Sequence, residues 1–256
     1  MLLKIRDVSK SFGGLVALED ISVDFEQGTI KAIIGPNGAG KTTLLNIISG
    51  IYSPDKGEVL FKGIPLHNLS PSEIARIGIS RTFQHVELFG NMTVIENIMV
   101  GRHVRTRGGL LACGLRLPYA RTEERMIIKD SEEILQYIGL YDKRNEKASS
   151  LPIGEERILE IGRALATEPN LLLLDEPASG LNEVETTELS EFIKRLRDQR
   201  GISIILVEHD MRLVMDISDS IVVLDFGRKI AEGSPQEISN NQLVRDAYLG
   251  DETVCY

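Results

Sequence analysis

The chain has 256 residues, of which 42% are hydrophobic, and a formal net charge of −9. This length can bury a full hydrophobic core, so we expect one domain with a sizeable insertion and no need for disulfides. The acidic balance argues against a nucleic-acid partner bound through a general basic surface. Cys113 and Cys255 match no metal or redox spacing and are predicted to be free thiols. No apolar run reaches membrane-spanning length and the N-terminus lacks a signal-peptide core, which predicts a cytosolic chain.

Residues 1–84 form the first predicted region, in which short apolar runs alternate with glycine and proline turns. Residues 29–34 are predicted to be a buried strand, and residues 43–49 a helix. Between them, residues 35–42 fit the pattern G-x-x-x-x-G-K-[ST] in the strand, loop and helix context that it requires. The pattern indicates a loop that binds the phosphates of a nucleoside triphosphate. A glycine-rich turn that binds nothing is the alternative, which the flanking elements disfavour.

The residue types of this loop explain its chemistry. Glycines let backbone N–H groups point inward and hold the β- and γ-phosphates at a helix N-terminus. Lys41 adds a positive charge, and the Thr42 hydroxyl is a ligand for Mg²⁺. The predicted nucleotide-binding residues here are Gly35, Pro36, Asn37, Gly38, Ala39, Gly40, Lys41, Thr42 and Thr43.

Residues 85–165 are predicted to form a helical insertion. From Ile127 to Ile138, residues that would share one face of a helix recur at intervals of three and four. Gly139 is placed to end the helix that this spacing predicts. Residues 166–256 then alternate strands and helices, which is typical of a parallel sheet. The predicted strands are 171–174, 202–207 and 221–224.

One further helix, over residues 183–197, has clear signals at its start and on its buried face. Asn182 and Glu185 form a predicted capping box, and an apolar stripe from Leu189 to Leu196 indicates core packing. The predicted fold class is therefore α/β: a P-loop core with a parallel sheet, an antiparallel β part near the N-terminus and a helical insertion.

Two adjacent acids, Asp175 and Glu176, follow a predicted buried strand, at the edge where open α/β sheets collect their ligands. In a P-loop nucleotidase, Asp175 would hold Mg²⁺ or its water, and Glu176 would take a proton from the attacking water. Pro177 is expected to push Glu176 toward an extended backbone. Acids that only solvate a strand end are the alternative, which the phosphate loop disfavours.

Together these residues resemble the ATP-binding cassette ATPases, the nucleotide-binding subunits of ABC transporters, over nearly the whole chain. The resemblance implies that Phe12 stacks on adenine and that Gln84 reports Mg²⁺ and the γ-phosphate to a membrane partner. It implies that His209 touches the γ-phosphate and orients the attacking water. It also places Asn182 at the nucleotide, in a segment, 179–182, that passes between two protomers. The implied catalytic residues are Glu176, His209 and Gln84, and the implied metal ligands are Thr42, Gln84 and Asp175.

The family signature Leu-Ser-Gly-Gly-Gln corresponds to Leu-Pro-Ile-Gly-Glu at 151–155, which differs at three positions. Pro152 has neither a hydroxyl nor an N–H for the γ-phosphate held by the opposite subunit. The Gly154 N–H and the following helix dipole must then hold that phosphate, and Glu155 would repel it. We expect two subunits to form an ATP-bridged dimer, and the stability of that dimer should depend on this unusual signature.

Within the family, the chain is similar to the ATPase subunits of importers for branched-chain amino acids. The proline of the signature, the ending at 247–250 and the longer segment 101–111 carry this similarity. It implies ATP hydrolysis with Mg²⁺, membrane permease subunits, and a second ATPase subunit that is identical or paralogous. A periplasmic or extracellular substrate-binding protein would be an indirect partner. The implied location is cytoplasmic, peripheral on the cytoplasmic face of the inner (cell) membrane, with no nucleic acid involved.

Three other functions fit parts of the pattern. They are an ATPase subunit of another ABC system such as lipopolysaccharide export, a soluble ABC protein acting on ribosomes or DNA, and a non-hydrolytic nucleotide sensor. A final feature is the arginine-rich segment 102–125, which is predicted to face a membrane subunit or lipid head groups. A solvated loop without a partner is the equal alternative for this segment.

Overall fold

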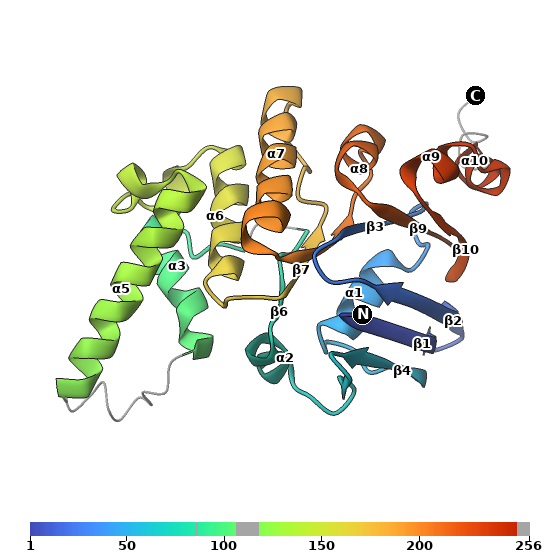
Figure 1. The fold of residues 1–256 in the computed structure, drawn as a ribbon, viewed down its shortest axis with the longest axis horizontal. Helices are drawn as coiled ribbons and strands as arrows, with labels where there is room; N and C mark the ends of the chain where they lie inside the picture. The colour runs from blue at the N-terminus through green and yellow to red at the C-terminus, as the bar shows by residue number, and fades with distance from the viewer. Residues whose placement is uncertain (85–86, 106–117, 250–256) are drawn as a thin grey trace.

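The computed structural model describes residues 1–84, 87–105 and 118–249. Two sheets and their covering helices make up the fold (Figure 1). Cys113, Cys255, Gly250 and residues 106–117, which include part of the arginine-rich segment, lie outside the described residues. None of the helices in the described part combines the length and the apolar character that a membrane crossing requires.

The smaller sheet is antiparallel and forms from the start of the chain. Its strands are β1 (Leu3–Phe12), β2 (Leu15–Phe25), β4 (Lys56–Phe61) and β5 (Ile64–Pro65), in the order β2-β1-β4-β5. Residues 13–14 make the turn between β1 and β2, where glycine supplies a positive φ at Gly13. This is the antiparallel β part that the sequence predicts.

The larger sheet has six strands in the order β10-β9-β3-β8-β7-β6. They are β6 (Ile79–Arg81), β7 (Leu171–Asp175), β8 (Ser203–Val207), β3 (Ile30–Ile34), β9 (Ser220–Asp225) and β10 (Arg228–Gly233). All are parallel except β10, which pairs with β9 antiparallel. The apolar runs of β3, β7 and β8 are buried along their whole length because helices or the smaller sheet cover both faces. The predicted α/β fold is confirmed.

Two hydrophobic clusters show which elements cover which face. Alternate residues of β3, β7 and β8 pack with α6 (Ile153–Leu165), α7 (Glu183–Arg200) and α8 (Met211–Ile217). The intervening residues pack with α1 (Lys41–Ile48) and the smaller sheet. The predicted stripe from Leu189 to Leu196 is buried on α7 in the first cluster, and the predicted capping box of Asn182 and Glu185 is present.

A helical part lies at the β6 side of the large sheet, at the left of Figure 1. It contains α3 (Val94–Arg102), α5 (Pro118–Ile138) and α6, with short 3-10 turns at Tyr141–Lys143 and Ala148–Ser150. Gly139 follows α5 with a φ of 80°, as the sequence predicts for the end of that helix. Gly101 lets α3 approach α6 closely, because a Cβ there would lie 2.2 Å from the Arg163 carbonyl oxygen.

Arg102 differs from the expectation for the arginine-rich segment. Its guanidinium is mostly buried and forms ion pairs with Asp130 and with Glu168, the latter at 2.6 Å. It also donates a hydrogen bond to the Ala166 carbonyl. The prediction of a membrane-facing cation is therefore wrong for Arg102, since this side chain ties α3 to α5 and to the end of α6.

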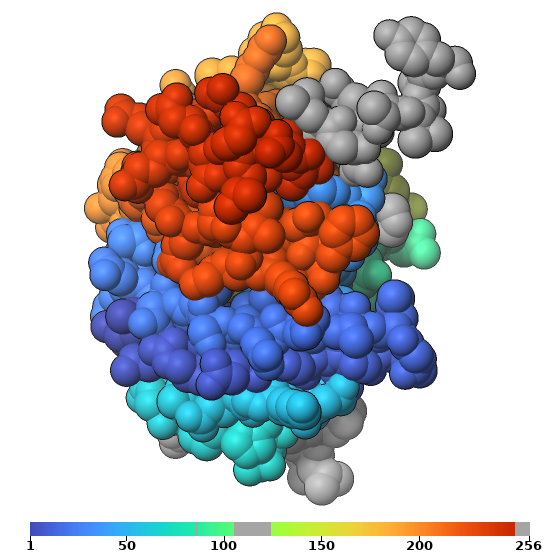
Figure 2. All heavy atoms as spheres, turned by 90° about the vertical axis from the view of Figure 1, so that its right-hand side faces the viewer, coloured from blue at the N-terminus to red at the C-terminus, as the bar shows by residue number. Residues whose placement is uncertain are grey.

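The last elements of the chain return to the first ones. After β10 come two short helices, α9 (Pro235–Ser239) and α10 (Gln242–Leu249), and Figure 2 shows these late elements above the N-terminal strands. The turn between β9 and β10 links both regions, because Gly227 N donates to the Ala39 carbonyl and Glu19 N donates to the Gly227 carbonyl. Arg228 adds an ion pair with Glu19 at 2.8 Å.

Candidate functional site

The predicted phosphate loop runs from the end of β3 to the start of α1. Glycine is required at two of its positions, which have positive φ and no space for a Cβ. A Cβ on Gly35 would lie 2.1 Å from the Leu224 carbonyl oxygen, and one on Gly40 would lie 2.6 Å from the Ala17 carbonyl oxygen. The loop is therefore backed by β9 on one side and by β2 on the other.

Lys41 lies within the curve of this loop. Its Nζ donates to the carbonyls of Gly35 at 2.7 Å and Pro36 at 2.9 Å. Burial lowers the pKa of Lys41, and the charges of Glu176 and Asp175 oppose that shift. Thr42, at the start of α1, is exposed. The loop thus contains a buried cation followed by an exposed hydroxyl, the two groups that a triphosphate and its metal ion need.

Asp175 ends β7 and is held by Arg81 at the end of β6. The two side chains are 2% and 6% exposed, and Asp175 Oδ2 lies 2.8 Å from the Arg81 guanidinium. The same guanidinium donates to Asn46 at 2.6 Å and to Ser49 at 3.2 Å, both on the helix side of the phosphate loop. Burial raises the pKa of Asp175, whereas the hydrogen bond from Arg81 lowers it. Asp175 Oδ1 is buried and has no hydrogen-bond partner among the described residues.

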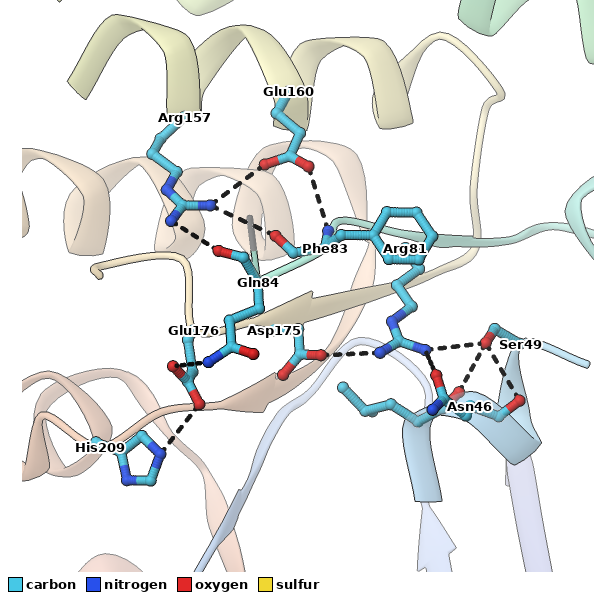
Figure 3. Close-up of polar contacts among 11 residues, drawn as sticks. Asn46, Ser49, Arg81, Phe83, Gln84, Arg157, Glu160, Asp175, Glu176 and His209 are labelled. Carbon is cyan, nitrogen blue, oxygen red and sulfur yellow. Dashed lines mark hydrogen bonds and ion pairs between the residues drawn. The ribbon is translucent and has the colours of Figure 1, made fainter. Parts of the chain in front are cut away.

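Glu176 is the meeting point of the predicted catalytic residues (Figure 3). Gln84 Nε2 donates to Glu176 Oε2 at 2.9 Å, and His209 Nε2 lies 3.0 Å from Glu176 Oε1. Three segments far apart in the sequence thus bring an amide, an imidazole and a carboxylate together beside the phosphate loop.

The backbone of Glu176 is not extended, so the expectation drawn from Pro177 is wrong. Its φ is 49°, in the left-handed region, while its N–H donates to the Val207 carbonyl at 2.8 Å. The Ser179 N–H in turn donates to the Glu176 carbonyl. These bonds close a tight turn directly after β7, and a non-glycine residue in this region stores roughly 1–3 kcal/mol of strain. Such strain is concentrated at functional sites.

The other predicted residues lie around this centre. Phe12, at the tip of β1, is 42% exposed and meets Tyr52 edge to face with ring centroids 5.1 Å apart. The Asn182 side chain accepts the N–H groups of Val184 and Glu185 as the cap of α7. Gly154 lies in the first turn of α6, where a Cβ would be 3.0 Å from Glu185 Oε1.

Glu155 has a partner that the sequence reading did not supply. Lys143 Nζ donates to both of its carboxylate oxygens, at 2.7 and 2.6 Å. The pKa of Lys143 is raised by this contact. The expected repulsion of a phosphate by Glu155 is therefore offset by a neighbouring cation, although this pair is partly exposed and is screened by solvent.

Sequence reasoning missed several charged side chains that are buried and hold the site in place: Arg81, Arg157, Glu160 and Glu208. Glu208 accepts the N–H groups of Ala178 at 2.7 Å and His209 at 2.9 Å, which joins the two segments on either side of Glu176. Burial raises the pKa of Glu208. Their positions in the sequence could have indicated burial, since each charged residue lies near a motif residue or among the apolar residues of a helix.

Tyr248 on α10 was also missed. Burial raises the pKa of its phenol to about 12, and the neighbouring backbone of Gly35 acts in the opposite direction. The C-terminal helix therefore reaches the first residue of the phosphate loop.

Two family models match the chain. The model described as ABC transporter matches residues 18–179, which include the phosphate loop, Gln84 and Glu176. The model described as Branched-chain amino acid ATP-binding cassette transporter matches residues 228–254, which include β10, α9 and α10.

Related proteins match over nearly their full length. The high-affinity branched-chain amino acid transport ATP-binding protein LivG of Escherichia coli (strain K12) is 44% identical over 98% of both chains. BraF of Pseudomonas aeruginosa, with the same description, is 40% identical over 98% of both chains.

Solved structures agree with these relatives. The ADP conformation of MJ1267, an ATP-binding cassette of an ABC transporter, aligns with a TM-score of 0.85 and 32% identity over 97% of this chain and 98% of that one. The dimeric cassette MJ0796 aligns with a TM-score of 0.77 and 26% identity over 91% and 99%. The chain therefore belongs to the ABC transporter family, as an ATP-binding cassette that hydrolyses ATP.

Proposed function

We propose that this chain is the ATPase subunit that energises an importer for branched-chain amino acids. The observation that carries the proposal is the convergence of Gln84 and His209 on Glu176 beside the phosphate loop. This is a hydrolytic site rather than a site for binding alone, because it contains a positioned base. The substrate class is supported by the names of the relatives and by the C-terminal match.

Each residue at the centre has a distinct proposed role. Glu176 accepts a proton from the attacking water. The contacts with Gln84 and His209 fix the orientation of its carboxylate. His209 then faces the γ-phosphate and fixes the water for in-line attack. Lys41 and the backbone N–H groups of residues 38–40 stabilise the charge on the phosphate oxygens.

The residues around Asp175 fit Mg²⁺. The buried, unpartnered Asp175 Oδ1, the exposed Thr42 hydroxyl and the Gln84 amide oxygen are hard oxygen ligands of the kind that Mg²⁺ prefers. Within the described residues, no cluster of three or more His, Cys, Asp or Glu side chains could hold a metal alone. Bound with ATP, Mg²⁺ would neutralise phosphate charge during transfer.

A second cassette completes the proposed site. Gly154 and the N-terminus of α6 supply a phosphate-binding helix end that belongs to the helical part of the chain, whereas the phosphate loop belongs to the core. We propose that these two surfaces face one ATP from opposite subunits, identical or paralogous. The solved dimeric structure of the related cassette MJ0796 supports the pairing of two cassettes.

An apolar groove of about 400 Å³ is the proposed contact for a permease. It lies between α2 (Pro71–Ile77), α3 and α6, and its apolar walls include Ile74, Phe89 and Val100. Arg81 and Phe83 line the same groove and lead directly to Asp175 and Gln84. A short apolar helix of a membrane subunit seated here would sense the nucleotide site. The chain would then sit on the cytoplasmic face of the membrane, with a substrate-binding protein as an indirect partner.

Uptake in living cells tests the proposal. Cells that lack this chain should lose uptake of radiolabelled leucine, and the wild-type chain should restore it whereas Glu176→Gln should not. Sulfate uptake is the control, because a sulfate/thiosulfate import ATP-binding protein of Burkholderia mallei is also 37% identical over 93% of this chain. Unchanged leucine uptake in the deleted cells would refute the substrate class.

A further inference from the structure

Arg157, in the second turn of α6, lies between three segments of the site. It is 5% exposed, and its guanidinium donates to the carbonyl of Gln84 at 2.9 Å. Longer hydrogen bonds of 3.4 Å reach the carbonyls of Phe83 and Ser179. A single side chain of the signature helix therefore contacts the segment that carries Gln84 and the segment that passes from Glu176 to Asn182.

Glu160, one turn further along α6, reaches the same segment from the same helix (Figure 3). Its carboxylate accepts the Phe83 N–H at 3.2 Å and lies 3.6 Å from the Arg157 guanidinium. Burial raises the pKa of Glu160, whereas the Phe83 N–H and the charge of Arg157 lower it. Phe83 thus has its N–H held by Glu160 and its carbonyl held by Arg157.

We infer that Arg157 is a positioning residue. It couples the position of α6, the helix that bears Gly154, to the orientation of Gln84 toward Glu176. Gln84 is held at both ends, since its backbone carbonyl is bound to Arg157 and its side-chain amide to Glu176. A displacement of α6 must therefore move the backbone of Gln84 relative to Glu176. The same guanidinium would carry that displacement to Ser179. The inference rests on the role proposed above for Gln84.

The chemistry of arginine suits this task. Its planar guanidinium has five donors in a fixed fork and can bind several carbonyls at once, whereas lysine offers a single point charge. Removing the fork would leave the Gln84 carbonyl without this partner in a partly buried place. A simpler structural role, in which Arg157 only neutralises Glu160, would need a cation but no fork.

A double-mutant cycle separates these two roles. In purified, ATP-competent protein, Arg157→Met is expected to lower kcat at least about tenfold, because small misplacements of catalytic groups have large effects on rate. The KM for ATP should change by less than about threefold, because the phosphate loop is untouched. In a Gln84→Ala background the same substitution should have little further effect, because both changes act on one interaction.

Two single variants make the test robust. Arg157→Lys keeps the charge beside Glu160 and is expected to fold, but its kcat should fall because it lacks the fork. Arg102→Met is the matched control, since it removes another buried guanidinium of the helical part whose contacts lie on α5 and beyond α6. It should lower Tm while keeping kcat.

Several results would overturn the inference. They are additive losses for Arg157→Met and Gln84→Ala, a wild-type kcat for Arg157→Lys, or an equal loss of kcat in Arg102→Met. None of these outcomes touches the proposed function, which fails instead if Glu176→Gln retains normal turnover.

Discussion

Arg81 forms an ion pair with Asp175, with the guanidinium 2.8 Å from the carboxylate and both side chains buried. Since Arg81 also donates to Asn46 and Ser49, the strand end that carries Asp175 is fastened to the helix that follows the phosphate loop. The spacing between the predicted metal ligand and the phosphate loop is thus set by one arginine.

Removing Arg81 should therefore be costly. Arg81→Met leaves a buried, unpaired carboxylate, and breaking such a pair typically costs about 3–5 kcal/mol. Urea unfolding measures this loss. The double variant Arg81→Met with Asp175→Asn should regain part of the stability, because it no longer buries a lone charge. A double variant less stable than Arg81→Met alone would contradict this account of the pair.

Replacing the proposed base should separate binding from hydrolysis. Glu176→Gln should bind ATP but lower kcat by roughly 10²–10⁴-fold, the usual contribution of a general base. The stalled protein should accumulate as an ATP-bridged dimer, visible by size-exclusion chromatography with ATP. Glu191→Gln is the control, since it makes the same chemical change on an exposed position of α7. Near-normal turnover of Glu176→Gln would refute the base assignment.

Gly154→Asp tests the half-site on the helical part. An aspartate would place a second carboxylate within contact of Glu185 and at the helix end that faces the phosphate. We expect kcat to fall at least about tenfold and the ATP-dependent dimer to disappear. Nucleotide binding to the monomer, followed by a fluorescent ATP analogue, should remain and serves as the internal control. Activity that does not change with Gly154→Asp would remove the dimer mechanism.

Phe12 offers a test of adenine stacking. Phe12→Ala should raise the KM for ATP by about fivefold or more, since stacking on an aromatic ring contributes ~1–3 kcal/mol. Phe12→Tyr keeps a ring and should behave like the wild type. Steady-state kinetics should show the change in KM with kcat nearly constant. An unchanged KM in Phe12→Ala would mean that the exposed ring serves only its packing on Tyr52.

Glu208 gives the fold a defined pH dependence. Burial raises its pKa above the ordinary value of 4.5, so the folded state binds more protons than the unfolded state above that pH. The free energy of unfolding therefore falls as pH rises through this window. Glu208→Gln cannot titrate, so the Tm of the wild type minus that of the variant should shrink from about pH 4 toward neutral pH. A difference that grows with pH would contradict the raised pKa.

Much of the fold and the core of the site were accessible from local sequence patterns. The buried strands, the capping box of Asn182 and the phosphate loop each depend on residues close together in the chain, so spacing alone revealed them. Glu176 was found because it follows a buried strand of a parallel sheet, at the edge where ligands collect. His209 was found through the resemblance to the ABC ATPases.

The supporting charges could not be found in the same way. Arg81 and Asp175 are 94 residues apart, and Arg157 and Gln84 are 73 apart, so only the folded chain pairs them. A buried arginine and an exposed one look alike in a sequence of mixed charge. The left-handed backbone of Glu176 was not predicted, because its hydrogen bonds to Val207 and Ser179 form only in the folded chain. These bonds override the extended conformation that Pro177 favours.

The turn between β9 and β10 bears on how this cassette can be divided. The Leu224 carbonyl lies against Gly35, and the Gly227 N–H donates to the Ala39 carbonyl. The phosphate loop is therefore supported by residues just before the segment 228–254, which matches the branched-chain family model. The specialised tail and the common ATP-binding core are thus not interchangeable modules. A chimaera that replaces everything after residue 223 would alter the support of the phosphate loop along with the tail, and its ATP affinity would report on both.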